Sequence, residues 1–335
     1  MGEAMKLKKS IIMAVFMCTL LLVFGMNGDL SAYVAALKQG TFTSTLGSDI
    51  AADPGKRLLK ETIEKEAIKR RIDPVDAKLD HVWKAIPGYN GLEVDVDQTY
   101  RLMKDAPEHA PIRYMYREIT PAVSLEQLGR QPIYKGNPNK PMVALMINVA
   151  WGNEFLEPML KTLEQHNVKA TFFLDGTWLK KNTDMARLIQ SYGHELSNHA
   201  YTHPNMSRLD RQTAYNEIAK TEALLKSTLN VNNVWFAPPS GDFNQMTVEV
   251  AAEQGLKTVL WTLDTVDWQH PPAASIVNKI RTRVEPGSLI LLHPTDSSSE
   301  ALPGMIAAIK HKGLLLGTVS ETLSTKRVRL VEAGT

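Results

Sequence analysis

Short apolar runs alternate with longer amphipathic segments over the last two thirds of the chain. Runs with flanking turn residues predict strands at residues 143–147, 170–174, 234–236, 258–261 and 289–292. Segments with helical spacing predict helices at residues 157–165, 185–192, 211–228, 247–253 and 274–283. Repeated strand–helix units favour a parallel sheet surrounded by helices, either open or closed into a barrel.

Polar side chains gather directly after these predicted strands. His199 and His203 follow residues 195–198, Asp264 and Asp267 follow the fourth apolar run, and His293 ends the last run. The residues after the carboxyl ends of parallel strands meet at one end of such a fold. The sequence therefore predicts a functional site there.

The first third of the chain has a different pattern. An amphipathic segment from Leu58 to Ile72 predicts a helix, residues 75–86 predict a second short helix, and residues 92–96 alternate like a strand. We expect a small α+β unit over residues 55–106. A proline-rich stretch, 107–137, then predicts a linker to a main domain at 138–326, which a tail at 327–335 follows.

The N-terminus carries an export-like segment. Basic residues at positions 6–9 precede an apolar run from Ile11 to Phe24, which has the length of a signal-peptide core. Residues 1–28 are thus predicted to be a cleaved signal peptide or a membrane anchor, and residues 29–54 a flexible linker. Both alternatives place the rest of the chain outside the cytoplasm, secreted or anchored to the membrane.

Composition narrows the classes of function. The 335 residues are 44% hydrophobic and 22% charged, as in a globular protein. The formal net charge of +2 gives no basic field for nucleic acid, so nucleic acid is not an expected partner. Cys18 is the single cysteine, and folding therefore relies on packing without an internal disulfide.

His199 and His203 have a spacing that suits one metal ion. Residues four apart can point the same way from a helical turn or tight loop, and neutral imidazole is a good zinc ligand. Pro204 argues against a long helix at this point. Such a pair alone is more commonly two polar loop residues, so its meaning depends on the other motifs.

The ordered motifs resemble the polysaccharide deacetylase family, also called the NodB homology domain. The resemblance covers residues 138–326 and rests on the histidine pair, the stretch 236–244, Asp264 to Trp268, and Leu291 to His293. Residues 78–95 and the N-terminal segment add a resemblance to the sporulation-associated branch of that family in Gram-positive spore formers.

This resemblance implies a distorted (β/α) barrel that hydrolyses N-acetyl groups of a glycan such as peptidoglycan. The family holds a divalent metal, most often zinc, through Asp-His-His, with an aspartate as base on the metal-bound water and a histidine as acid. Here the implied metal ligands are His199 and His203, and the implied acid is His293. Asp264 or Asp267 would orient His293, a choice that the sequence leaves open. The implied substrate contacts are Trp268, Pro239, Ser240 and Leu291.

Three positions depart from the family pattern. Asn148 stands where the base belongs, Val149 where the metal aspartate belongs, and Ala237 where an arginine pairs with the catalytic aspartate. An amide cannot accept a proton at useful pH, and an isopropyl group cannot coordinate a cation. The losses are mutually consistent, because an arginine without its carboxylate would be an uncompensated charge.

Another carboxylate could replace the lost ligand. Asp175 is the first candidate and Glu154 the second, although a turn before Gly176 is the more ordinary role for Asp175; Asp242 fits a turn or cap. Two hypotheses remain. One is an extracytoplasmic metal-dependent deacetylase with altered ligation, and the other is a catalytically silent relative that binds glycan or a partner in the cell or spore envelope.

Overall fold

The computed structural model describes residues 54–107 and 109–328. The predicted signal or anchor (1–28), almost all of the predicted linker (29–54) and the end of the tail lie outside these residues. Within them, contacts separate one unit of residues 54–69 and 95–115 from a larger unit of residues 70–94 and 116–328. No helix in this part of the chain combines the length and apolarity needed to cross a membrane.

The smaller unit contains two helices. α4 (Pro54–Arg70) confirms the predicted amphipathic helix and buries Ile63. α5 (Val96–Met103) begins at Asp95, whose carboxylate accepts a hydrogen bond from the backbone N–H of Gln98. A carboxylate at this position satisfies a free N–H group of the first turn and thereby fixes where the helix begins.

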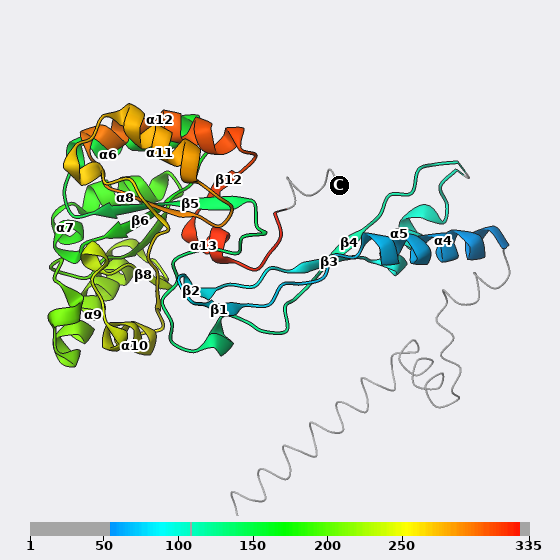
Figure 1. Cartoon of the computed structure of the whole chain (residues 1–335), viewed down its shortest axis with the longest axis horizontal. Coiled ribbons are helices and arrows are strands. Elements are labelled where there is room, and N and C mark those ends of the chain that lie inside the picture. The colour runs from blue at the N-terminus through cyan, green and yellow to red at the C-terminus, as the bar shows by residue number, and fades with distance from the viewer. Residues whose placement is uncertain (1–53, 108, 329–335) are drawn as a thin grey trace, which may run out of the picture. The chain divides into compact units, whose positions relative to one another are not determined.

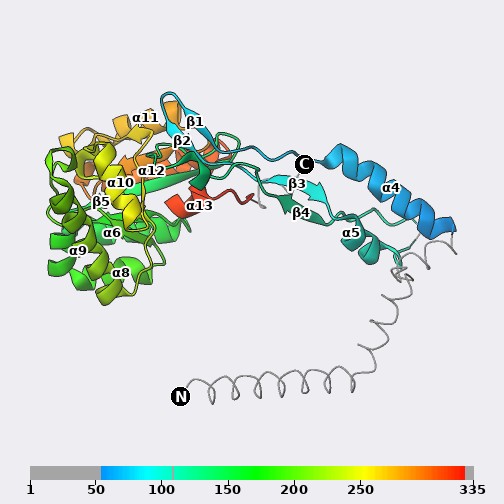
Figure 2. The ribbon, with the colours of Figure 1, turned by 90° about the horizontal axis from the view of Figure 1, so that it is seen from below.

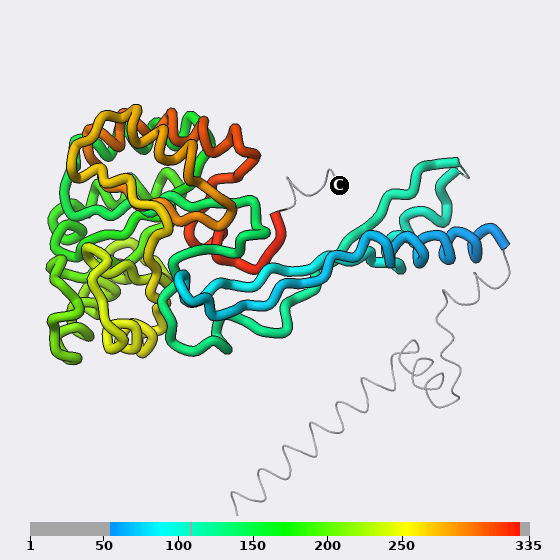
Figure 3. Tube along the Cα trace, viewed as in Figure 1, coloured from blue at the N-terminus to red at the C-terminus, as the bar shows by residue number. Residues whose placement is uncertain are grey.

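The larger unit begins with two antiparallel strand pairs, whose course Figure 3 traces in blue to teal. β1 (Lys78–Asp80) pairs with β2 (Lys84–Ile86), and β3 (Gly91–Val94) with β4 (Tyr116–Ile119). The helix predicted at 75–86 is wrong. Asp80 accepts backbone N–H bonds from Val82 and Trp83, and Lys84 has φ 56°, so the chain turns back into a hairpin.

Eight described strands form the main sheet, and their hydrogen-bonded order is β10-β11-β5-β6-β7-β8-β9, all parallel, with β12 also paired to β5. The sheet curls into a half-barrel, which confirms the predicted (β/α) barrel type. Each of the five predicted apolar runs overlaps a strand, although the third strand is shorter than predicted and the fourth shares only Thr258 with its run. The bounds are β5 Met142–Val149, β6 Thr171–Leu174, β7 Glu195–Asn198, β8 Trp235–Phe236, β9 Lys257–Thr258, β10 Leu263–Asp264, β11 Leu289–Leu292 and β12 Leu315–Gly317.

Helices cover the outside of this sheet (Figures 1 and 2), except that Val319 and Leu323 of α13 pack on its other side with Ala144 and Met146 of β5. All five predicted helices are present, whereas α7, α12 and α13 were not predicted. The bounds are α6 Asn153–Gln165, α7 Gly176–Lys181, α8 Thr183–Ser191, α9 Arg211–Leu229, α10 Gln245–Glu253, α11 Ala273–Arg283, α12 Asp296–His311 and α13 Val319–Leu323. Short 3-10 turns are η1 Glu126–Leu128, η2 Met206–Arg208, η3 Pro239–Gly241 and η4 Asp267–Gln269.

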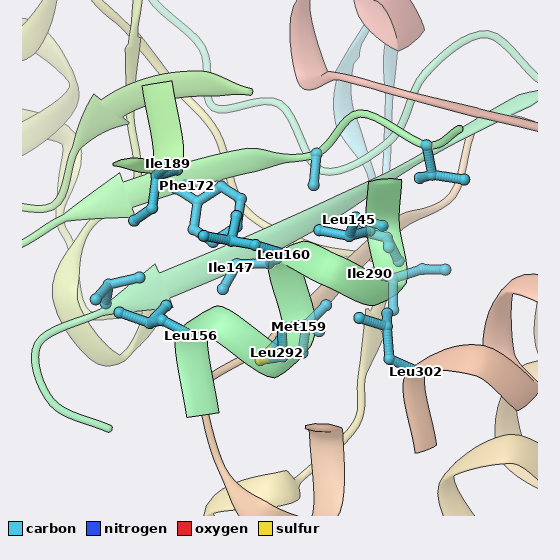
Figure 4. Close-up of a cluster of buried hydrophobic side chains, with 14 of the residues drawn as sticks. Leu145, Ile147, Leu156, Met159, Leu160, Phe172, Ile189, Ile290, Leu292 and Leu302 are labelled. Atoms are coloured by element: carbon cyan, nitrogen blue, oxygen red, sulfur yellow. The ribbon is translucent and has the colours of Figure 1, made fainter. Parts of the chain in front are cut away.

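Strand β5 separates two hydrophobic clusters. Its residues 143, 145, 147 and 149 pack in the large cluster between the sheet and α6, α8, α11 and α12, part of which Figure 4 shows. Ala144 and Met146 belong to a second cluster on the inner side of the sheet, with Phe173 and Ala237. Successive side chains of a strand point to opposite faces. This alternation places Asn148 on the inner face and Val149 on the helix-covered face.

Candidate functional site

The carboxyl ends of β5, β6, β7 and β11 bring the predicted polar residues to one end of the sheet. Leu292 lies opposite Ile147, so the next residues in this register are His293 and Asn148. Asn148 in turn lies opposite Phe173, and Leu174 lies opposite Asn198, the residue before His199. The parallel register therefore gathers segments that are far apart in the sequence.

His199 is fixed in one orientation. Its side chain is buried, and Nδ1 lies 2.7 Å from the carbonyl oxygen of Ala237, to which it donates. Nε2 then keeps its lone pair, because a neutral imidazole carries one proton. Burial lowers the pKa of His199 to about 3, which keeps the ring neutral. This is the orientation that a metal-binding imidazole requires.

His203 lies beside His199, with ring centroids 5.1 Å apart and ring planes at 72°. Burial lowers the pKa of His203, and the nearby Asp175 carboxylate offsets only part of this effect. Its backbone has φ 56°, and Ala200 in the same loop has φ 60°. Two residues with side chains in the left-handed region are strained, so the surrounding contacts must hold this loop in place.

Glu217 supplies the main contacts of the histidine loop. One carboxylate oxygen accepts backbone N–H bonds from Tyr201 at 3.0 Å and from Thr202 at 2.8 Å. Asn198 Oδ1 accepts a third bond, from the Ala200 N–H at 2.8 Å. These acceptors satisfy the backbone groups that the strained loop leaves without partners.

His293 forms a dyad with Asp267. Its Nδ1 lies 2.8 Å from Asp267 Oδ1, and the second carboxylate oxygen accepts bonds from the His293 backbone N–H and the Ser298 hydroxyl. Burial alone would raise the pKa of Asp267, but the bonds from His293 and Ser298 outweigh it and the pKa lies below its ordinary value. Asp267, and not Asp264, is thus the aspartate that is hydrogen-bonded to His293.

Asp264 has a different role. Its Oδ1 accepts a backbone N–H bond from Val266 at 2.7 Å, which shapes the turn after β10. Trp268, in η4, is 52% exposed. The other predicted substrate contacts differ in accessibility: Pro239 and Leu291 are buried, and Ser240 is exposed with φ 55°.

The three residues that depart from the family pattern are all buried. Asn148 is buried on the inner face, and its Oδ1 has no hydrogen-bond partner among the described residues. Val149 is fully buried in the helix-side cluster, and Ala237 is fully buried in the inner cluster. None of these side chains can take up a proton at useful pH, and none carries the charge of the family's metal aspartate.

The substitute carboxylates do not complete a metal site. Asp175 is the N-cap of α7: its Oδ1 accepts from the Trp178 N–H at 2.8 Å and from the Thr177 hydroxyl. Burial raises its pKa. Asp242 binds Ser207 through both carboxylate oxygens, and Glu154 is exposed in the first turn of α6.

Across residues 54–107 and 109–328, no three His, Cys, Asp or Glu side chains are grouped so that they could hold a metal ion. Asp175 is therefore not grouped with His199 and His203 as a third ligand in the described part of the chain. Two imidazoles alone are fewer protein ligands than a catalytic zinc site uses. The residues present do not fit the metal that the family employs.

Trp151 is the site residue that sequence reasoning did not identify. Its ring stacks on His293, with centroids 5.3 Å apart and planes at 16°, and meets His203 edge-on at 6.5 Å. The sequence did carry a signal, because Trp151 comes two residues after Val149, in the loop that follows the first strand. A large aromatic side chain there lies among the predicted site residues.

The stability of the protein should fall in mild acid. Burial lowers the pKa of His194 from 6.5 to about 4, and the backbone N–H of Ala170 donates to its Nδ1. Between pH 6.5 and pH 4, His194 binds a proton in the unfolded chain but stays neutral in the folded chain. Protonation therefore favours the unfolded state as the pH falls below 6.5, and the full free energy of unfolding is present above pH 6.5. At pH 5 the loss is about 2 kcal/mol for His194.

Urea unfolding at pH 7.5 and pH 5 measures this loss. His194→Gln should reduce the dependence of the unfolding free energy on pH, whereas His311→Gln, at an exposed position of α12, should leave it unchanged. An unaltered dependence in His194→Gln would contradict the assignment.

The histidine loop should depend on Glu217. Glu217→Ala leaves the N–H groups of Tyr201 and Thr202 without their acceptor and should lower the free energy of unfolding by about 1–3 kcal/mol. Glu217→Gln keeps an acceptor oxygen and should lower the free energy of unfolding by a smaller amount. Urea unfolding gives the first result, and hydrogen exchange at the two amides shows whether the loss is local. Equal stability of the two variants would contradict the role of Glu217.

Comparison with known proteins agrees with this geometry. Residues 135–259 match the family model described as polysaccharide deacetylase. The uncharacterized protein YlxY of Bacillus subtilis is 42% identical over 96% of this chain and 99% of its own length. A peptidoglycan-N-acetylglucosamine deacetylase of Bacillus cereus is 35% identical over 58% of this chain and 73% of its own.

A solved structure extends the comparison. The crystal structure of a CE4 family pseudoenzyme from Bacillus anthracis has a TM-score of 0.74 and 42% identity, and covers 81% of this chain and 96% of that one. A mutant of that protein, described as having restored enzymatic activity, has the same TM-score and 41% identity, and covers 81% of this chain and 99% of its own. The chain described here belongs to the polysaccharide deacetylase family.

Proposed function

We propose that this protein is a catalytically silent polysaccharide deacetylase relative that binds N-acetylated glycan of the cell envelope at the end of its half-barrel. The observation that carries the proposal is the place of Val149. The position of the family's metal aspartate holds an apolar side chain that packs into the core beneath the helices. The site therefore lacks this metal ligand, and the side chain at position 149 contributes to the hydrophobic core instead.

Hydrolysis of an amide would need groups that this site lacks. Asn148 cannot take a proton from water, and a general base typically contributes about 10²–10⁴-fold to rate. A catalytic metal would add several kcal/mol of stabilisation to the developing charge, and the residues present do not complete its coordination. His293 and Asp267 remain positioned to hold or move a proton at Nε2, but Asn148 at the position of the family's base cannot activate a water.

Other features support ligand binding at the same place. Trp151 and Trp268 are 45% and 52% exposed, although a large aromatic side chain is usually buried unless it serves a contact. His203 and His293 supply polar groups beside Trp151. The Bacillus cereus relative is named for N-acetylglucosamine of peptidoglycan, which makes peptidoglycan the glycan we propose.

The cellular setting is also part of the proposal. The basic and apolar pattern of residues 1–28 supports export, with the chain secreted or held at the membrane by that segment. The resemblance of residues 78–95 to the sporulation-associated branch supports a role in the cell or spore envelope. A tagged protein found in the cytoplasm would contradict this placement.

A competing function is deacetylation with altered zinc ligation by His199, His203 and Asp175. The observation that favours it is Asp175 Oδ2, which is buried and has no hydrogen-bond partner among the described residues. The N-cap bonds of the other oxygen already give this carboxylate a structural role, and we therefore place this function second.

Metal analysis and acetate release distinguish the two functions. The purified full-length chain should contain far less than one zinc per molecule and should release no acetate from N-acetylated peptidoglycan, because base and third ligand are absent. The Bacillus cereus deacetylase serves as the active control. Stoichiometric zinc that is lost in His203→Ala, together with acetate release, would establish the competing function instead.

Restoring the missing groups should restore metal binding. In the triple variant Asn148→Asp, Val149→Asp and Ala237→Arg, the change at position 149 adds a buried carboxylate that costs stability until a cation pairs with it. Zinc should therefore raise the melting temperature of the triple variant and leave the parent unchanged.

The matched control for this experiment carries Asn148→Asp and Ala237→Arg only. Because it lacks the third ligand, its melting temperature should not respond to zinc. Absence of a zinc response in the triple variant would show that position 149 does not align with the family's metal aspartate.

A further inference from the structure

The loop between β5 and α6 places Trp151 in the middle of the site. The indole stacks on His293 and meets His203 edge-on, so it lies between the dyad and the histidine loop. It is nevertheless 45% exposed. The side chain therefore contacts the protein on one side and leaves a large part of its surface accessible at the site.

The chain after Trp151 is held firmly. Gly152 has φ 80°, and a Cβ at this position would lie only 2.0 Å from the carbonyl oxygen of Pro294, the residue after His293. Asn153 Oδ1 accepts from Trp178 Nε1 at 2.6 Å, and its Nδ2 donates to Asn182. The loop is thus pinned to the β11–α12 segment on one side and to α7 on the other.

An indole stacked on His293 in a loop held in this way is suited to a sugar ring. One face of a pyranose presents C–H groups with partial positive charge, and the face of an aromatic ring carries the negative part of its quadrupole. A side chain that already packs against a neighbouring ring loses less conformational entropy when the ligand binds. The accessible part of Trp151 therefore offers a preformed contact for a pyranose of an N-acetylated glycan.

We propose that Trp151 is the principal sugar-contacting residue of this protein and that its indole binds the sugar without the participation of a metal ion. This inference rests on the glycan-binding function proposed above. His293, which Asp267 holds by a hydrogen bond, stacks on one face of the indole. Binding of the glycan is therefore independent of divalent metal.

The experiment uses the full-length chain and a β-1,4-linked tetramer of N-acetylglucosamine, with binding measured by calorimetry in EDTA and in added zinc. The parent should bind equally in both. Trp151→Ala should weaken binding about tenfold or more, because the contact surface is lost. Trp151→Phe keeps an aromatic face and should retain part of the affinity.

Tyr215→Ala is the matched control, since Tyr215 is 40% exposed on α9 and lies outside the site residues described above. It should bind the tetramer as the parent does. Thermal unfolding of each variant separates loss of binding from loss of folding, and Trp151→Phe gives a second test if Trp151→Ala is unstable.

The outcomes separate the two proposals. Binding by the parent that Trp151→Ala leaves unchanged overturns the role of Trp151 while glycan binding stands. Binding that EDTA abolishes shows that a metal anchors the sugar and also overturns this inference. No binding by the parent overturns the glycan-binding function, and the role of Trp151 with it.

Discussion

The alternation of side chains along β5 is the constraint on which the site depends. This strand pairs with β6, β11 and β12, so its register is fixed from both sides. With residues 143, 145 and 147 committed to the helix-side core, position 149 falls on the same face and position 148 on the inner face. A shift by one residue would turn the whole apolar set towards the wrong face. Val149 therefore packs in the hydrophobic core, although the family has a metal-binding aspartate at this position.

The same packing bears on why part of the family's site is retained although Asn148 and Val149 replace its two carboxylates. His199 donates to the Ala237 carbonyl, Glu217 holds the histidine loop, and Asp267 binds His293 and Ser298 while fully buried. A buried polar group that loses its partner destabilises the fold. These side chains are consequently required for folding as much as for chemistry. Two of the three changed positions, Val149 and Ala237, now pack against apolar neighbours, whereas Asn148 is buried with an Oδ1 that has no hydrogen-bond partner among the described residues.

Sequence patterns predicted the elements with long apolar runs or clear helical spacing and missed those defined by pairing. β7, β10 and β12 are short, and their partners in the sheet rather than their own residues make them strands. The segment 75–86 has apolar residues that suit a helix, but Asp80 binds the backbone of the next turn and Lys84 takes a left-handed conformation. Local side-chain bonds and cross-strand pairing outweighed helical spacing there.

The sequence by itself determined what the site cannot do. Asn148 cannot accept a proton at useful pH and Val149 cannot bind a cation, and this holds in any conformation. Only the tertiary structure decided which groups meet: Asp267 rather than Asp264 on His293, Asp175 as a helix cap, and Trp151 between His203 and His293. Whether a side chain can bind a proton or a cation depends on its own functional group. Which side chains contact one another depends on the register of parallel strands that are distant in the sequence.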